Sequence, residues 1–389
     1  MKTPLALYFH WPFCQSKCPY CDFNSHVRKD YREAAYIDAL SAEITALPRL
    51  FDGFSFDDYH ISSIFFGGGT PSLMRAKSVE TLIHHVSANF SMMDDIEITL
   101  EANPSSMEYS KFADFRAAGI NRLSLGIQSL DDKILRFLER PHDAAQARQA
   151  IETAARHFDR YSFDLIYGIK DQSLSDWKDQ LQEAMKLAGN HISLYQLTIE
   201  PGTNFMTRSK QGETLTLDEG AADQAYRFTL DMLESLAFKA YEISNFATSG
   251  EESRHNLSYW QYQDYLGFGA GAHSRFLHQG ETHAFHRIRL PERWLAAVTE
   301  QGGAASIAQS ETLTSAQIYQ EICLMGLRLS QGIDESYLIA RTQMGFDHLT
   351  QAALNDFIKA GWLEVTPKKA LRATPKGRIR LDSILTELL

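Results

Sequence analysis

The sequence lacks the features of several large classes of protein. No stretch approaches the roughly 20 apolar residues that a membrane-spanning helix needs, so we expect no transmembrane segment. Acidic residues outnumber basic ones, 49 to 38, and the net charge of −11 provides no general basic surface for nucleic acid. Internal repeats and low-complexity tracts are also missing, which argues against a repeat protein or a disordered chain.

Cysteine is scarce, but its distribution is uneven. Only four cysteines occur in 389 residues, and three of them lie between positions 14 and 21. The N-terminal segment does not resemble a secretory signal, because its short apolar run is interrupted by Pro4, His10 and Pro12. We therefore expect a cytoplasmic protein, in which clustered thiols bind metal or perform redox chemistry more often than they form disulfides.

Short β-rich runs alternate with helical patterns through the first half of the chain. Because parallel strands need helical crossovers, this order predicts an α/β fold. The strands are almost continuously apolar, which indicates a parallel sheet covered on both faces, either open or a partial barrel. The predicted strands are 5–11, 61–68, 96–103, 122–128, 160–168 and 191–199, and the clearest helices between them are 32–47, 76–90 and 174–189.

The second half has a different pattern. Residues 215–238 predict one long amphipathic helix, and 240–290 are rich in glycine, histidine and aromatic residues with few regular signals. The C-terminal part predicts helices followed by two short strands and a final helix, as in a winged-helix module. Such a module can bind nucleic acid, and a role in packing or as a lid is the alternative. We divide the chain into a core (1–240), a connecting region (241–300) and a smaller, mainly helical C-terminal domain (301–389).

Cys14, Cys18 and Cys21 follow the spacing C-x3-C-x2-C directly after the first predicted strand. Reactive groups gather beyond the carboxyl ends of parallel strands, so the position suits a functional site. Structural zinc normally takes four protein ligands, and no fourth cysteine lies nearby, although His10 or His26 could serve. A four-iron cluster on three thiolates leaves one iron open to a small molecule. The spacing therefore favours an iron–sulfur cluster over zinc or a disulfide.

The sequence YFHWPFCQSKCPYCDFNSH resembles the signature of the radical S-adenosylmethionine (SAM) superfamily. Within it, the loop is similar to the family of oxygen-independent coproporphyrinogen III oxidases and heme chaperones. The resemblance implies a partial (β/α)6 radical-SAM barrel followed by the winged-helix-like domain. It also implies a [4Fe-4S] cluster on Cys14, Cys18 and Cys21, with SAM bound to the open iron and cleaved there to a 5′-deoxyadenosyl radical.

Residues suited to SAM lie at the ends of successive predicted strands. The glycines of FFGGGTPS let the backbone approach a ligand closely, although a tight turn would also use them. Asp164 interrupts an apolar strand, where a structural hydrogen bond is the alternative role. The motif DLIYGIKDQS departs from the family, which usually has a Pro-Gly turn there. By match to the family, the SAM contacts are Tyr8, Tyr20, Gly68, Gly69, Thr70, Glu101, Gln128, Arg140 and Asp164.

Two features point to the heme chaperone branch. The oxidases carry a further cysteine two residues after the third and a longer segment before the cluster, whereas this chain has Phe23 and only thirteen preceding residues. The sequence RHNLSYW (254–260) is also similar to the HNxxYW element of the chaperones. This resemblance implies heme contacts through His255, Asn256, Tyr259 and Trp260, since imidazole is a common axial ligand. The alternative is a helix start capped by Asn256, with aromatic core residues.

Two other residues stand apart from these motifs. The glycine-rich LGFGAGAHSR (266–275) does not open an early βαβ unit, so we reject a dinucleotide site. We expect a close backbone approach near the cluster there, with His273 as a weaker heme candidate. Cys323 lies on an apolar helical face and is expected to be a buried core thiol.

The sequence therefore predicts a heme chaperone rather than an enzyme. It would pass heme to acceptor hemoproteins, among them membrane-bound respiratory enzymes reached by peripheral contact. An electron donor would serve the cluster, and no nucleic-acid partner is expected. The alternative is an oxygen-independent coproporphyrinogen III oxidase, in which the radical abstracts hydrogen from a propionate side chain before carbon dioxide is lost. The acidic charge disfavours a third class, a nucleic-acid modifier.

Overall fold

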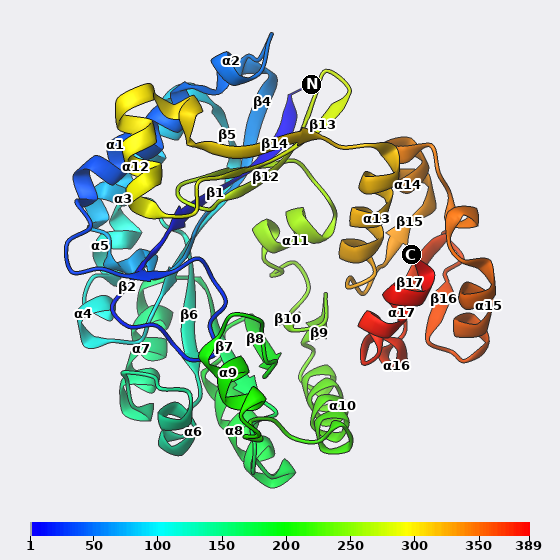
Figure 1. Ribbon diagram of the computed structural model, residues 1–389. Coiled ribbons are helices and arrows are strands. Elements are labelled where there is room, and N and C mark those ends of the chain that lie inside the picture. The colour runs from blue at the N-terminus through cyan, green and yellow to red at the C-terminus, as the bar shows by residue number, and fades with distance from the viewer. Residues whose placement is uncertain (1) are drawn as a thin grey trace.

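The computed structural model describes residues 2–389, with the side chain of Ser106 left out. Its main feature is a curved twelve-stranded sheet with helices on the outer face and a smaller C-terminal unit beside it (Figure 1). The strand order is β14-β13-β12-β11-β1-β4-β5-β6-β7-β8-β10-β9, so the sheet is open. No helix in the described part of the chain is long and apolar enough to cross a bilayer.

A parallel core forms the centre of this sheet. All six predicted strands are confirmed, and each pairs in parallel with the next. Their side chains are largely buried, as expected where helices cover the outer face (Figure 1). The partial (β/α)6 barrel is thus confirmed. Its strands are β1 (Thr3–Trp11), β4 (Tyr59–Gly68), β5 (Ser91–Ala102), β6 (Arg122–Gln128), β7 (Arg160–Tyr167) and β8 (His191–Gln196).

Helices connect these strands and close the outer layer. The predicted long helix begins only at Glu219, because the Asp218 side chain accepts a hydrogen bond from the Ala221 amide and caps it. The larger helices are α1 (Glu33–Thr45), α3 (Ala76–Asn89), α7 (Ala144–His157), α8 (Leu174–Leu187), α10 (Glu219–Ser235) and α12 (Pro291–Gln301). The shorter ones are α2 (Leu47–Leu50), α4 (Ser106–Tyr109), α5 (Phe112–Ala117), α6 (Asp132–Phe137), α9 (Asn204–Lys210) and α11 (Arg254–Trp260).

The glycine-rich region contains strands that we did not predict. Strand β11 (Tyr265–Phe268) pairs in parallel with β1, and the antiparallel strands β12 (His273–His278), β13 (Glu281–Arg287) and β14 (Ile307–Thr312) extend the sheet. Short, glycine-interrupted runs give no clear strand signal; here β11 pairs with the distant β1, and β12 to β14 pair outward from it in turn. Two short strands, β10 (Asn245–Ala247) and β9 (Lys239–Ala240), extend the sheet beyond β8, and β2 (Phe13–Cys14) and β3 (His26–Val27) form a separate two-stranded sheet.

The C-terminal unit has its own hydrophobic core. The two predicted strands and final helix are confirmed, and Cys323 is 1% exposed within this core, as expected. Its elements are α13 (Ser315–Gly326), β15 (Ile333–Asp334), α14 (Glu335–Thr342), α15 (Gln351–Lys359), β16 (Leu363–Val365), β17 (Ala370–Ala373), α16 (Pro375–Arg378) and α17 (Leu381–Leu388).

A fully buried ion pair joins α1 to β13. Nη1 of Arg287 lies 3.0 Å from Oε1 of Glu43, and neither side chain is exposed. The indole of Trp294 donates to the same carboxylate at 2.7 Å, and the Gly269 amide donates to it at 2.8 Å. Nε of Arg287 donates to the carbonyl of Gly267 at 2.8 Å. The pair therefore fixes the turn that connects β11 to β12.

We expect Glu43→Ala to lower the free energy of unfolding by about 3–5 kcal/mol, because it leaves the Arg287 charge buried without its partner. Glu364→Ala is the matched control, since its carboxylate is 47% exposed and pairs with Arg372 at the surface. That change should cost less than about 1 kcal/mol. Urea unfolding followed by circular dichroism measures both, and similar losses in the two variants would contradict the role of the buried pair.

Candidate functional site

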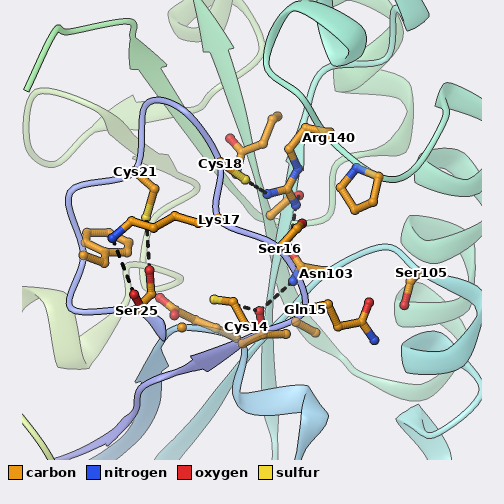
Figure 2. A pocket seen from close by; sticks show the side chains of 18 of the residues that line it. Cys14, Gln15, Ser16, Lys17, Cys18, Cys21, Ser25, Asn103, Ser105 and Arg140 are labelled. Atoms are coloured by element: carbon orange, nitrogen blue, oxygen red, sulfur yellow. Dashed lines mark hydrogen bonds between the residues drawn. The ribbon is translucent and has the colours of Figure 1, made fainter. Parts of the chain in front are cut away.

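The cysteine loop lies at the carboxyl edge of the parallel strands. A cavity of about 150 Å³ opens there, lined by the three cysteines of the loop and by residues at the ends of β4, β5, β6 and β7. Figure 2 shows the loop wrapping around this cavity, with Cys14, Cys18 and Cys21 carried on its turns. Residues that are distant in sequence thus meet at one site, as parallel β/α folds require.

The three thiols are free and partly exposed. The Thr70 hydroxyl donates to Sγ of Cys14 at 3.5 Å, and the Arg140 guanidinium donates to Sγ of Cys18 at 3.2 Å. Such donors stabilise thiolates, which are the form that binds metal. Burial raises the pKa of the Cys14 and Cys21 thiols, so loading with iron would release protons.

The arrangement of these ligands fits a cluster. Within residues 2–389, no group of three or more His, Cys, Asp or Glu side chains converges to hold a single metal ion. A four-iron cluster does not require such convergence, because each thiolate binds a separate iron. Three thiolates beside an open cavity leave the fourth iron free to bind a further ligand.

Asn103 is a site residue that we did not include among the predicted contacts. Nη2 of Arg140 donates to Oδ1 of Asn103 at 2.6 Å and to the Gly126 carbonyl at 2.9 Å. Nδ2 of Asn103 donates to the Thr70 hydroxyl at 2.9 Å. A chain of hydrogen bonds therefore runs from Cys18 through Arg140 and Asn103 toward Cys14 (Figure 2). The sequence signal that could have identified Asn103 as a site residue was its position in LEANP, at the end of a predicted strand.

Three carboxyl groups line the same cavity, those of Glu101, Glu108 and Asp164. Burial and the nearby charge of Asp164 raise the pKa of Glu101 to about 8, and burial raises the pKa of Asp164 to about 6. Oε2 of Glu101 accepts a hydrogen bond from the Gly68 amide at 3.1 Å, where the backbone has a left-handed φ of 111°. A ligand ammonium would favour the ionised form of such a carboxyl. Strongly shifted acids in a cleft are typical of functional sites.

The structure brings most of the predicted SAM residues together. Tyr8 lies instead in an adjoining cavity, and the contacts to SAM themselves remain a prediction. A buried Nε of Arg140 has no hydrogen-bond partner among the described residues, so a ligand oxygen could accept from it. The residues that line the cysteine cavity are Tyr20, Gly68, Gly69, Thr70, Glu101, Gln128, Arg140 and Asp164.

The HNxxYW residues do not share one cavity. His255 is 1% exposed, with Nδ1 2.8 Å from the Ser63 hydroxyl and Nε2 2.8 Å from the Tyr259 hydroxyl. A heme contact from His255 would require both hydrogen bonds to be replaced. Tyr259 lines the adjoining cavity, whereas Trp260 faces a different cavity at the C-terminal unit, with the Arg328 guanidinium 4.6 Å from its ring centroid.

The start of α11 is held by a buried carboxylate. Ser253 caps the helix by accepting from the Asn256 amide, so Asn256 is not the capping residue. The amide of His255 donates to Oε1 of Glu97 at 3.1 Å, and Nη1 of Arg160 lies 2.8 Å from Oε2 of the same carboxylate. These contacts anchor the helix to the inner face of β5 and β7 and explain why its histidine points into the protein.

Two family models match the chain, and its relatives span most of its length. The Radical SAM superfamily matches residues 8–184, and the HemN C-terminal domain matches residues 313–380. The mitochondrial radical S-adenosyl methionine domain-containing protein 1 of Bos taurus is 37% identical over 99% of this chain and 87% of its own. The heme chaperone HemW of Haemophilus influenzae is 40% identical over 75% of this chain and 76% of its own.

A solved structure shares the fold. It is the coproporphyrinogen III oxidase (HemN) from Escherichia coli, described as a radical SAM enzyme. The two chains superpose with a TM-score of 0.81 at 23% identity, over 99% of this chain and 90% of the other. This likeness includes the C-terminal unit as well as the open barrel.

We expect the protein, reconstituted without oxygen, to hold about four irons per chain and to absorb at about 400 nm. Cys18→Ala should lose most of the iron and of this absorption, since two thiolates hold a cluster poorly. Cys323→Ala is the control, because its thiol is buried in the C-terminal core, away from the cysteine cavity. Iron analysis and absorption spectra measure both properties. Zinc bound in place of iron would contradict the prediction of an iron–sulfur cluster.

Proposed function

The chain belongs to the radical SAM superfamily, together with the HemW and radical S-adenosyl methionine domain-containing 1 proteins, and from this premise we propose that it is a heme chaperone. It would bind heme and transfer it to acceptor hemoproteins. The observation that carries the proposal is the 40% identity to a named heme chaperone, against 23% to the oxidase that shares its fold. The proposed role is therefore that of a carrier rather than a catalyst.

Phe23 supports the same conclusion. It stands where the oxidases have a further cysteine, and its side chain is 57% exposed although it is large and apolar. It lines both the cysteine cavity and the adjoining cavity. An exposed aromatic ring at the junction of two cavities is suited to contact an apolar ligand, whereas a fourth thiolate would add charge there.

The cysteine cavity would serve a [4Fe-4S] cluster and SAM. Cys14, Cys18 and Cys21 would hold the cluster, which with SAM supplies one-electron reductive cleavage when both are bound. The carboxylate of Glu101 would pair with the SAM ammonium. The free Nε of Arg140 would take a carboxylate or ribose oxygen, while its Nη1 donates to Sγ of Cys18.

The remaining partners follow from the same proposal. Acceptors would include membrane-bound respiratory hemoproteins reached by peripheral contact, and a separate protein would supply electrons to the cluster. The net charge of −11 argues against nucleic acid as a partner. We expect a cytoplasmic location, and relatives named as mitochondrial make the organelle the alternative to test.

A specific observation favours a second candidate, the oxygen-independent coproporphyrinogen III oxidase. The likeness to HemN covers 99% of the chain, so the same fold can perform radical decarboxylation of a porphyrinogen. In that case, the cavity beside the cluster would hold a substrate with propionate side chains. The two functions predict different results with the same protein preparation.

We expect the reconstituted protein to bind hemin saturably, at about one per chain, and to leave coproporphyrinogen III unchanged in the presence of SAM and a reductant. The reason is that Phe23 replaces the additional cysteine of the oxidases. Absorption titration measures the first property, and mass spectrometry of the porphyrins measures the second. Decarboxylation without hemin binding would establish the oxidase instead.

We also expect the affinity for SAM to rise with pH between 6 and about 8. The Glu101 carboxyl is protonated below its pKa of about 8, and pairing with an ammonium requires the ionised form, so binding in this range releases a proton. The rise should be up to about tenfold per pH unit. Glu101→Gln should bind at least about tenfold more weakly and lose this dependence.

Equilibrium dialysis of SAM at several pH values measures this effect. Glu80→Gln is the control, because Glu80 lies on the outer face of α3 and pairs with Lys77 at the surface. An unchanged pH dependence in Glu101→Gln would show that another group controls SAM binding.

A further inference from the structure

A second cavity, of about 420 Å³, lies beside the cysteine cavity. The two share Phe23, Gly68 and Glu101, so they adjoin at the carboxyl ends of β1 and β4. The opposite wall comes from β11, from the turn into β12 and from Arg289 after β13, a region whose strands the sequence did not reveal. A molecule in this cavity would lie next to the cysteine loop.

Aromatic rings form much of the wall of this second cavity. Tyr8, Phe23, Tyr259 and Tyr265 all line it. The rings of Tyr259 and Tyr265 meet edge to face, with centroids 4.5 Å apart, and so hold each other in place. The exposed ring of Phe23 lies at the rim. Flat apolar surfaces of this kind suit a flat macrocycle.

The cavity contains two imidazoles with different surroundings. His10 is 6% exposed, with Nδ1 3.0 Å from the Tyr8 hydroxyl and Nε2 2.9 Å from the Asn24 carbonyl. The ring of His273 is exposed and makes no side-chain hydrogen bond within residues 2–389. Its cross-strand neighbour His286 lies with ring centroids 5.3 Å apart and is engaged by Gln309. His273 therefore has both nitrogens available.

The positive groups around His273 favour the uncharged form of its imidazole, which is the form that can bind iron. Partial burial, together with the His286 ring and the Arg275 and Arg289 guanidinium groups, lowers the pKa of His273. Near neutral pH the imidazole is uncharged, which is the form that coordinates a metal. Arg289 also lines the cavity, and its guanidinium makes no ion pair or side-chain hydrogen bond with any described residue. Its forked donors fit a carboxylate.

The loop before His273 is fixed to the cysteine loop. Nδ2 of Asn24 donates to the carbonyls of Ala270 and Arg289, each at 2.9 Å. The Tyr36 hydroxyl accepts from the Ala270 amide at 3.0 Å. At Gly271 φ is 82°, and a Cβ there would collide with the Asn24 amide, so only glycine suits this close approach. The cavity wall is therefore held by side-chain hydrogen bonds rather than formed by a free loop.

From this geometry we propose that the second cavity is the heme site, in which His273 binds the heme iron and Arg289 pairs with a propionate. The inference rests on the proposed function and deepens it by assigning the cargo site. In this proposal the HNxxYW element does not bind the heme iron. His255 is instead a positioning residue, whose Nε2 lies 2.8 Å from the Tyr259 hydroxyl and holds that side chain against the cavity. No change in the heme itself is required, only an iron–nitrogen coordinate bond.

The test compares hemin binding by the reconstituted full chain and by His273→Ala, His255→Ala and His84→Ala. His84 is exposed on the outer face of α3 and is the control. We expect His273→Ala to bind hemin about tenfold more weakly and to lose the electron paramagnetic resonance signature of an imidazole ligand. Free imidazole should restore that signature. His84→Ala should match the wild type, and His255→Ala should keep the imidazole signature.

Arg289 is tested with a modified ligand. Arg289→Gln should weaken the binding of hemin several-fold without changing the iron spectrum. The same variant should bind hemin dimethyl ester as well as the wild type does, since the ester has no carboxylate to pair.

The outcomes separate the two proposals. If the wild type fails to bind hemin, the proposed function fails and the cargo site fails with it. If the wild type binds hemin and His273→Ala keeps the imidazole signature, only our assignment is overturned. The same conclusion follows if His255→Ala, shown by circular dichroism to be folded, loses the imidazole signature.

Discussion

The common direction of neighbouring strands is the constraint on which the rest of this structure depends. Strands β11, β1, β4, β5, β6, β7 and β8 all run the same way, so their carboxyl ends meet at one edge of the sheet. The cysteine loop follows β1, Thr70 follows β4 and Asn103 follows β5. No single segment of the chain contains the site, and several of these strands add groups to it.

The two adjoining cavities use different physical chemistry. The cysteine cavity combines thiols, a largely buried guanidinium and carboxyl groups whose pKa values burial has raised, so it favours small charged ligands. The second cavity has aromatic walls and an uncharged imidazole, so it favours a larger, flatter and less polar ligand. Phe23 and Glu101 lie at the boundary, where the two environments meet. Under the proposed function, a charged cofactor and an apolar cargo would occupy separate but neighbouring spaces.

Sequence patterns were informative where local signals sufficed. Continuous apolar runs predicted the six parallel strands, and the cysteine spacing located the loop. Strands β11 to β14 were missed because their runs are short, and the first of them, β11, is fixed by pairing with β1, far away in the sequence. The HNxxYW motif indicated which residues lie together on one helix, but not that Ser63 and Tyr259 occupy both nitrogens of His255. The role of Asn24 was also hidden, since its partners, the carbonyls of Ala270 and Arg289, are set by tertiary structure.

The pairing of β1 with β11 has a consequence for the order in which the protein is made. The ribosome produces β1 and the cysteines first, but the second neighbour of β1 arrives only with Tyr265–Phe268. Until then β1 is an edge strand with unpaired backbone groups, and Asn24 lacks the carbonyl of Ala270 as a partner. Contacts of such long sequence separation form slowly. The thiols are therefore synthesised early but enclosed late, which would leave an interval in which the proposed cluster could be loaded.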